Sequence, residues 1–140
     1  MLENTENLLR LKTLKSNMDY GMFLPIQKAA IAAITGDQAC VAETRAAYEK
    51  RRDILCDGLK EIGWEMMKPE ATMFVWAKIP EGFDDSEQFV MELFDKTGVL
   101  VTPGSAFGPS GEGYVRMALV QDQEVLGEMI RAIDESGILK

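Results

Sequence analysis

The sequence predicts an α+β fold in which helices cover one face of a small, mainly antiparallel sheet of about three strands. Apolar residues recur at helical spacing in five segments but alternate at strand spacing in only three. The last two predicted strands are joined by a turn-rich loop of about ten residues. A chain of 140 residues is long enough for one domain with a sizeable core.

Five segments have helical patterning. The first covers residues 4–15, and residues 16–23 then break the pattern. The second covers residues 25–34, with Pro25 in the first turn, where a missing N–H costs nothing. The third and longest covers residues 38–62. We expect the second helix to face the core through its apolar residues Ile26, Ala29, Ala30, Ala33 and Ile34.

The second half of the chain contains the predicted strands. Residues 72–79 alternate as a strand does, and a helix capped at Asp84, Asp85 or Ser86 then runs to Gly98. A short β-branched strand begins at Val99, the glycine-rich loop follows, and another strand covers residues 114–120. The last helix covers residues 122–136.

Composition excludes several classes of function. Hydrophobic residues make up 46% and charged residues 27% of the chain, as in ordinary soluble proteins. A net charge of −8 argues against binding to nucleic acid or to anionic membranes, and no apolar run approaches the ~20 residues that span a bilayer. The first residues do not resemble a signal peptide. We therefore expect a cytoplasmic protein with no nucleic-acid or membrane partner.

The residues that usually carry catalysis are sparse. The absence of histidine excludes histidine-based catalysis within this chain and most transition-metal sites, so no metal is expected. Cys40 and Cys56 lack metal-binding or redox spacing, and we interpret them as free thiols. The loop glycines do not lead into a helix as a phosphate loop does, and no lysine is a persuasive nucleophile.

Arg116 is the unusual residue of the sequence, because it lies in the middle of an otherwise apolar strand. Two interpretations are open. The arginine could lie at the surface or on an edge strand, with its charge in water. Alternatively, its planar guanidinium could bind a carboxylate or phosphate through two parallel hydrogen bonds. The preceding glycine loop favours the second interpretation, because glycines let a ligand approach the backbone closely.

Three ordered motifs resemble the class I/II aminotransferases, the fold-type-I enzymes that use pyridoxal 5′-phosphate. TPGSAFGPSGEGYVRMAL resembles their C-terminal motif. LKSNMDYGMFLPIQKAAIAAI resembles the loop and helix after the cofactor-lysine segment, and PEATMFVWAKIP resembles the strand that opens the small domain. The helix with YEKRRDIL also fits. Within the family, the likeness is closest to bacterial alanine and aspartate aminotransferases.

The resemblance implies roles for four residues. In the family, the arginine of the last strand binds the α-carboxylate of the substrate, and that position is Arg116. The family's DYG-type loop lies at a dimer interface near the partner's active site, and those positions are Asp19, Tyr20 and Gly21. The resemblance therefore implies a homodimeric parent enzyme. It would transfer an amino group between an amino acid of the alanine, aspartate or glutamate type and a 2-oxo acid.

The same resemblance implies that residues 1–140 are the C-terminal domain of such an enzyme. The family's Schiff-base lysine, the aspartate that pairs with the pyridine nitrogen and the phosphate-binding residues belong to a large cofactor-binding domain, and their motifs are not in this sequence. No catalytic residue is assigned here for that reason. We expect the isolated chain to bind no pyridoxal phosphate and to be inactive.

Other functions stay open at this stage. The chain could be a free-standing regulatory domain that binds an amino-acid carboxylate at Arg116. It could also be a dimerisation module without a ligand, with the helix at 4–15 and Trp76 supplying the surface. Fold-type-I lyases and decarboxylases share the small domain, so the type of reaction follows from the resemblance alone.

Overall fold

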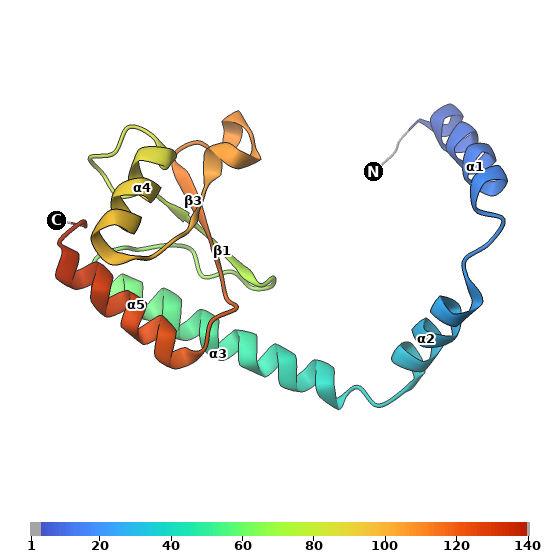
Figure 1. Cartoon of the computed structure of the whole chain (residues 1–140), viewed down its shortest axis with the longest axis horizontal. Coiled ribbons are helices and arrows are strands. Elements are labelled where there is room, and N and C mark those ends of the chain that lie inside the picture. The colour runs from blue at the N-terminus through green and yellow to red at the C-terminus, as the bar shows by residue number, and fades with distance from the viewer. Residues whose placement is uncertain (1–3, 140) are drawn as a thin grey trace. The chain divides into compact units, whose positions relative to one another are not determined.

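The computed structural model describes residues 4–139 and divides the chain into two compact units, Met1–Val41 and Ala42–Lys140 (Figure 1). The first unit contains two helices. The second contains the three-stranded sheet and two further helices, and the long helix α3 begins just before it. The predicted α+β class and the small antiparallel sheet are confirmed.

Helix α1 covers Thr5–Asp19 and is longer than predicted. Its N-terminus is capped by Asn4, whose side chain accepts hydrogen bonds from two backbone N–H groups of the first turn. The predicted break at residue 16 is wrong, because Asn17 donates its side-chain N–H to the Thr13 carbonyl and extends the helix. The helix ends where Tyr20 adopts the left-handed conformation, with φ of 45°.

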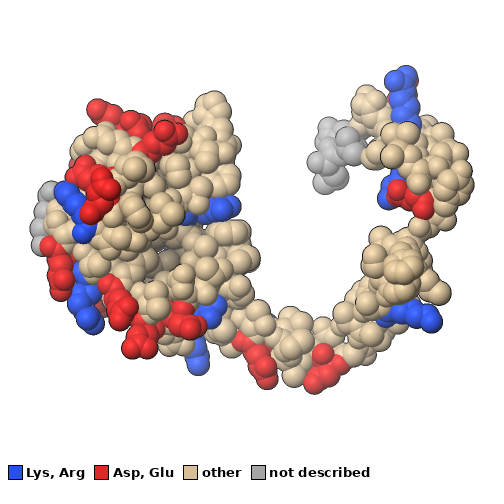
Figure 2. All heavy atoms as spheres, viewed as in Figure 1, with Lys and Arg blue, Asp and Glu red and all other residues tan. Residues whose placement is uncertain are grey.

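Helix α2 covers Leu24–Thr35, and Pro25 lies in its first turn as predicted. The prediction that its apolar side chains face a core is wrong, because no residue of α2 is buried in this chain. Its surface is almost entirely uncharged in Figure 2, since Lys28 is its only charged residue. Ile26, Ile31 and Ile34 each expose more than half of their surface.

Helix α3 covers Ala39–Glu61, and Asp37 accepts a hydrogen bond from the Ala39 N–H at its start. Only the C-terminal part of the helix is buried, through Leu55, Cys56 and Leu59. Val41, near the start of the helix, is exposed.

The sheet has the strand order β1–β3–β2, with both pairs antiparallel. Strand β1 covers Phe74–Lys78, β2 Thr102–Pro103 and β3 Tyr114–Ala118. The predicted strand at Val99 is reduced to two residues. Pro103 limits the pairing because it has no backbone N–H, and proline in a sheet is accordingly confined to an edge such as this one.

Helix α4 has the predicted boundaries, and α5 begins one residue later than predicted. Helix α4 covers Ser86–Thr97, with Asp85 accepting the Gln88 N–H at 2.7 Å and Gly98 ending the helix at φ of 71°. Helix α5 covers Gln123–Ser136. Asp122 precedes α5 without a capping hydrogen bond to the helix.

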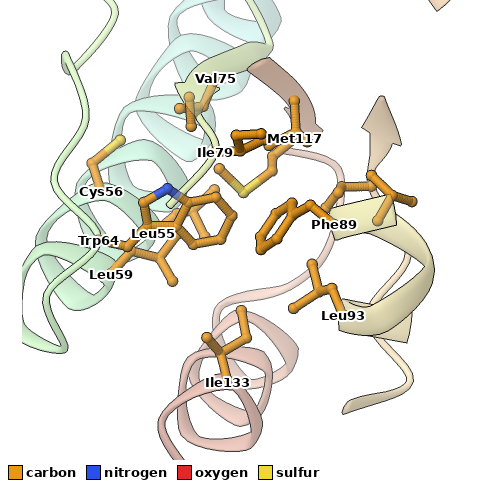
Figure 3. Close-up of a cluster of buried hydrophobic side chains, with 14 of the residues drawn as sticks. Leu55, Cys56, Leu59, Trp64, Val75, Ile79, Phe89, Leu93, Met117 and Ile133 are labelled. Carbon is orange, nitrogen blue, oxygen red and sulfur yellow. The ribbon is translucent and has the colours of Figure 1, made fainter. Parts of the chain in front are cut away.

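The core lies between one face of the sheet and the three helices α3, α4 and α5 (Figure 3). Phe89 is fully buried at its centre, with edge-to-face contacts to the rings of Trp64 and Phe83 at centroid distances of 5.3 and 5.0 Å. The sheet contributes its inward-facing residues Val75, Ala77, Val115 and Met117. The opposite face of the sheet carries the site described next.

Candidate functional site

Arg116 lies on β3, the central strand of the sheet. Its register partners are Trp76 on β1 and Thr102 on β2. Because Val115 and Met117 are buried on the core side, alternation along the strand directs Arg116 to the opposite face, where it is half-buried. The interpretation of Arg116 as an edge-strand residue is therefore wrong.

Aromatic rings surround the Arg116 guanidinium. Its Cζ lies 4.2 Å from the ring centroid of Phe74 and 4.6 Å from that of Phe107. Trp76 stacks on Tyr114 with a centroid separation of 5.7 Å and meets the Phe107 ring edge-on at 5.6 Å. Cation–π contacts of this kind stabilise a cation by about 0.5–2 kcal/mol, depending on how far it is removed from water. The rings hold the guanidinium without neutralising it.

No hydrogen bond or ion pair joins the Arg116 guanidinium to another residue of the described range, 4–139. This is unusual in a chain with 23 acidic residues. Arg51 and Arg52, whose side chains are about one-fifth exposed, each bind a carboxylate, on Asp122 and Asp53 respectively. The N–H donors of Arg116 are thus available to an anion from outside, and their planar fork matches a carboxylate or phosphate.

The glycine-rich loop that precedes β3 consists of two short 3₁₀ turns, Gly104–Phe107 and Pro109–Gly111. The turns meet backbone to backbone at their base. A Cβ atom on Gly104 would lie 1.9 Å from the Gly111 carbonyl oxygen, and one on Gly111 would lie 2.1 Å from that of Gly104. The two glycines are thus required by packing, and the loop that they close carries Phe107, whose ring lies beside Arg116.

We predict that Gly104→Ala destabilises the second unit by about 1–3 kcal/mol or more, because the added methyl group meets backbone that cannot rotate away. Urea unfolding measures the difference. Gly127→Ala is the matched control, since a Cβ at this position in α5 meets nothing within 4 Å. It should stabilise the protein by about 0.5–1 kcal/mol. Equal stability of Gly104→Ala and the wild type would contradict the packing argument.

Glu112 fixes the end of this loop. Its Oε1 atom accepts hydrogen bonds from the backbone N–H groups of Gly113 at 2.7 Å and Ser86 at 2.6 Å. These two bonds, the one from Gly113 first, hold the pKa of the Glu112 carboxyl below its usual range. The carboxylate therefore joins the loop to the first residue of α4.

Asp19, Tyr20 and Gly21 lie together at the end of α1, in the first unit. Asp19 forms an ion pair with Lys15, and the Tyr20 side chain is 91% exposed. Gly21 has φ of 122°, a conformation that glycine adopts without the strain that a side chain would cause. Arg116 belongs to the second unit, so the partner-subunit role of the three residues stays a prediction.

Other chemistry finds little support within residues 4–139. This range contains no group of three or more histidine, cysteine or acidic residues that could hold a metal ion. None of the helices described is both long and apolar enough to cross a membrane. Cys40 and Cys56 are free thiols as predicted, and burial raises the pKa of Cys56.

Sequence reasoning identified Arg116 but missed the rings that hold it. Phe74 and Trp76 are two positions apart on β1 and therefore lie on the same face of the strand. This spacing in the sequence could have indicated that the two rings belong to one surface. Phe107 lies in the loop, where no periodicity indicates which way a side chain points. Thr72, next to β1, adopts φ of 80°, a strained conformation for a β-branched residue that the sequence did not indicate.

Comparison with known proteins places this geometry in context. The model of the aminotransferase class I and II family matches residues 4–133. The LL-diaminopimelate aminotransferase of Halothermothrix orenii is 44% identical over 133 residues, and the glutamate-pyruvate aminotransferase AlaC of Escherichia coli is 43% identical over 135. Each alignment covers 95% of this chain but 33% of the relative.

Solved structures agree. The apo structure of BacF from Bacillus subtilis superposes with a TM-score of 0.78 at 36% identity, covering 94% of this chain and 34% of that one. A probable N-succinyldiaminopimelate aminotransferase from Thermus thermophilus gives 0.80 at 32% identity, covering 94% and 35%.

The chain belongs to the class I and II aminotransferase family. It spans about a third of the length of the curated relatives it matches. The family depends on pyridoxal phosphate. Lys78 is the one lysine on the described strands and lies on the same sheet face as Arg116, but it is exposed, so this sheet face does not fit the group as a covalently held cofactor.

Proposed function

We infer that residues 1–140 form the C-terminal, substrate-binding part of an aminotransferase that transfers an amino group between an amino acid and a 2-oxo acid. One observation carries the proposal: Arg116 is held by aromatic rings on the central strand and has no acidic partner within residues 4–139. Such a guanidinium suits the α-carboxylate common to both substrates. Family membership supports the type of reaction.

The role of Arg116 in this reaction is orientation. Two parallel N–H···O bonds fix both oxygens of a carboxylate and thereby fix the direction of the bond to the α-carbon. Holding the α-carbon in one place relative to the reacting groups lowers the entropic part of the barrier. Pyridoxal phosphate supplies the electron-accepting chemistry when it is bound. In our proposal it is held by segments other than those described here.

We propose a group of candidate substrates and not a single amino acid. The relatives include enzymes named for LL-diaminopimelate and for glutamate and pyruvate. We propose that the amino-acid substrate is of the alanine, aspartate or glutamate type. Diaminopimelate is a further candidate, because a relative is named for it. A cytoplasmic homodimer, with Asp19, Tyr20 and Gly21 near the partner's site, belongs to the same proposal.

A chimeric enzyme tests the proposal. Residues 1–140 replace the matching third of the E. coli glutamate-pyruvate aminotransferase AlaC. We expect the chimera to transfer an amino group from glutamate to pyruvate, and the 140-residue chain alone to show no activity. A chimera that folds and takes up pyridoxal phosphate but transfers no amino group would overturn the proposal. Activity of the isolated chain would overturn our expectation that it is inactive.

A measurement of amino-acid binding by the isolated chain distinguishes this proposal from the alternative of a free-standing regulatory domain that binds an amino-acid carboxylate at Arg116. Calorimetry with millimolar glutamate or alanine is expected to give no saturable heat, because a single half-buried arginine that water still reaches binds a carboxylate weakly. Saturable, tight binding by the chain alone would favour a free-standing amino-acid sensor instead.

A further inference from the structure

The glycine-rich loop is attached to helix α4 at two places. Glu112, at the end of the loop, accepts the Ser86 N–H at 2.6 Å. Ser105, at its beginning, donates its N–H to the fully buried Ser86 hydroxyl at 3.3 Å and its own hydroxyl to Glu87 at 3.1 Å. These hydrogen bonds join the first turn of α4 to loop residues that lie 18 to 26 positions further along the sequence.

The bond from Glu112 to α4 is separate from the side-chain cap at Asp85, because each carboxylate accepts a different N–H of the first turn. Asp85 already caps this helix by accepting the Gln88 N–H at 2.7 Å. Glu112 instead accepts a different N–H, that of Ser86, together with the N–H of its own neighbour Gly113. A carboxylate that bridges a helix start and a distant loop fixes the position of the loop.

The position of the loop determines the surroundings of Arg116. Phe107 is two residues from Ser105, and its ring lies 4.6 Å from the Arg116 Cζ atom. The same ring meets Trp76 edge-on. Yet Phe107 is half exposed, so packing alone does not fix it. Its contact with the guanidinium depends on where the loop is held.

We propose that Glu112 is a positioning residue for the Arg116 site: by fixing the loop of residues 104–113 on α4, it holds the Phe107 ring against the guanidinium. The effect of this positioning on substrate binding rests on the function proposed above. With Phe107 in place, the guanidinium has fewer orientations and less contact with water, and both effects strengthen a bidentate bond to a carboxylate. Without Glu112, the arginine keeps its charge but loses this preorganisation.

Nuclear magnetic resonance of the 140-residue chain tests the positioning directly. Aromatic rings shift the resonances of nearby protons, so the Arg116 Hε signal and its cross-peaks to Phe107 report the contact. Glu112→Ala should move the Hε signal toward its value in an unstructured peptide and remove the cross-peaks. Glu112→Gln keeps an acceptor oxygen for both N–H groups and should preserve them. Glu124→Ala, which removes an exposed acidic residue in the first turn of α5, is the matched control and should change nothing.

A folded Glu112→Ala variant with unchanged Arg116 signals would overturn the proposal. Should that variant fail to fold, Glu112→Asp takes its place, because the shorter side chain keeps the charge but cannot reach both N–H groups. Unchanged Arg116–Phe107 cross-peaks in folded Glu112→Asp would overturn the proposal equally.

The chimeric enzyme tests the functional consequence. Glu112→Ala should raise the KM for the amino acid by about tenfold, the size expected for one lost aromatic contact to the cation, with kcat changed less than about twofold. Glu112→Gln should restore the KM. If the resonance changes appear while Arg116→Leu leaves KM unchanged, the proposed function fails and the positioning role stands. If Arg116→Leu raises KM but Glu112→Ala leaves both KM and the resonances unchanged, only the positioning role fails.

Discussion

Replacing Arg116 with leucine in the chimeric enzyme is expected to raise the KM for the amino acid by about 10²–10³-fold. The substitution removes two charge-assisted hydrogen bonds, each worth about 1.5–3 kcal/mol. Their loss, partly offset by water, amounts to about 3–4 kcal/mol, and each 1.4 kcal/mol is a factor of ten. The isobutyl side chain still fills part of the space between Phe74 and Phe107. Steady-state kinetics with glutamate measures the change.

Arg116→Lys separates charge from geometry. Lysine keeps the positive charge but cannot present two parallel donors, so its KM should lie between those of the wild type and Arg116→Leu. Arg131→Leu, on the exposed face of α5, is the matched control and should leave KM within about twofold. An unchanged KM in Arg116→Leu would remove the assignment of Arg116 as the carboxylate-binding residue.

The largest loss of stability is expected for Phe89→Ala. Phe89 is fully buried and contacts the rings of Trp64 and Phe83 at the centre of the core (Figure 3). Truncating a buried phenylalanine costs about 3–5 kcal/mol, which combines lost burial with the cavity left behind. Small domains have total stabilities of about 5–15 kcal/mol, so much of this unit's stability should disappear. Urea unfolding followed by circular dichroism measures the change.

Phe94→Ala provides the comparison on the same helix. Phe94 is 44% exposed, and its truncation should cost about 1 kcal/mol or less. If both variants lost the same stability, the core would not be centred on Phe89 as the structure places it.

Local signals predicted the helices of the second unit well. Asp85 and Gly98 delimit α4 because an N-cap and a left-handed glycine act within a few residues of the chain. Helix α2 behaved differently. Its apolar residues have helical spacing, but spacing says nothing about whether a surface exists to cover them, and no residue of α2 is buried in the part of the chain that the structure describes. Strand β2 was overestimated because Pro103 limits its pairing.

The candidate site was predicted in part. Arg116 was recognisable because a cation in an apolar strand contradicts the local pattern. Its place on the central strand was not, because strand order depends on contacts between β1 and β3 that are about 40 residues apart in sequence. Phe107 and Glu112 act through a loop whose form depends on two glycine backbones in contact. Such contacts leave no periodic trace in a sequence.

Helices α1 and α2 contain no buried residues, so they should take little part in the cooperative unfolding of this chain. Helices of 12 to 15 residues are marginal in water unless tertiary packing supports them. Cooperative unfolding therefore reports on the hundred or so residues that enclose Phe89, and the denaturant slope should match the surface buried by that part alone. Helices α1 and α2, which precede it, therefore contribute little to the cooperative free energy of unfolding.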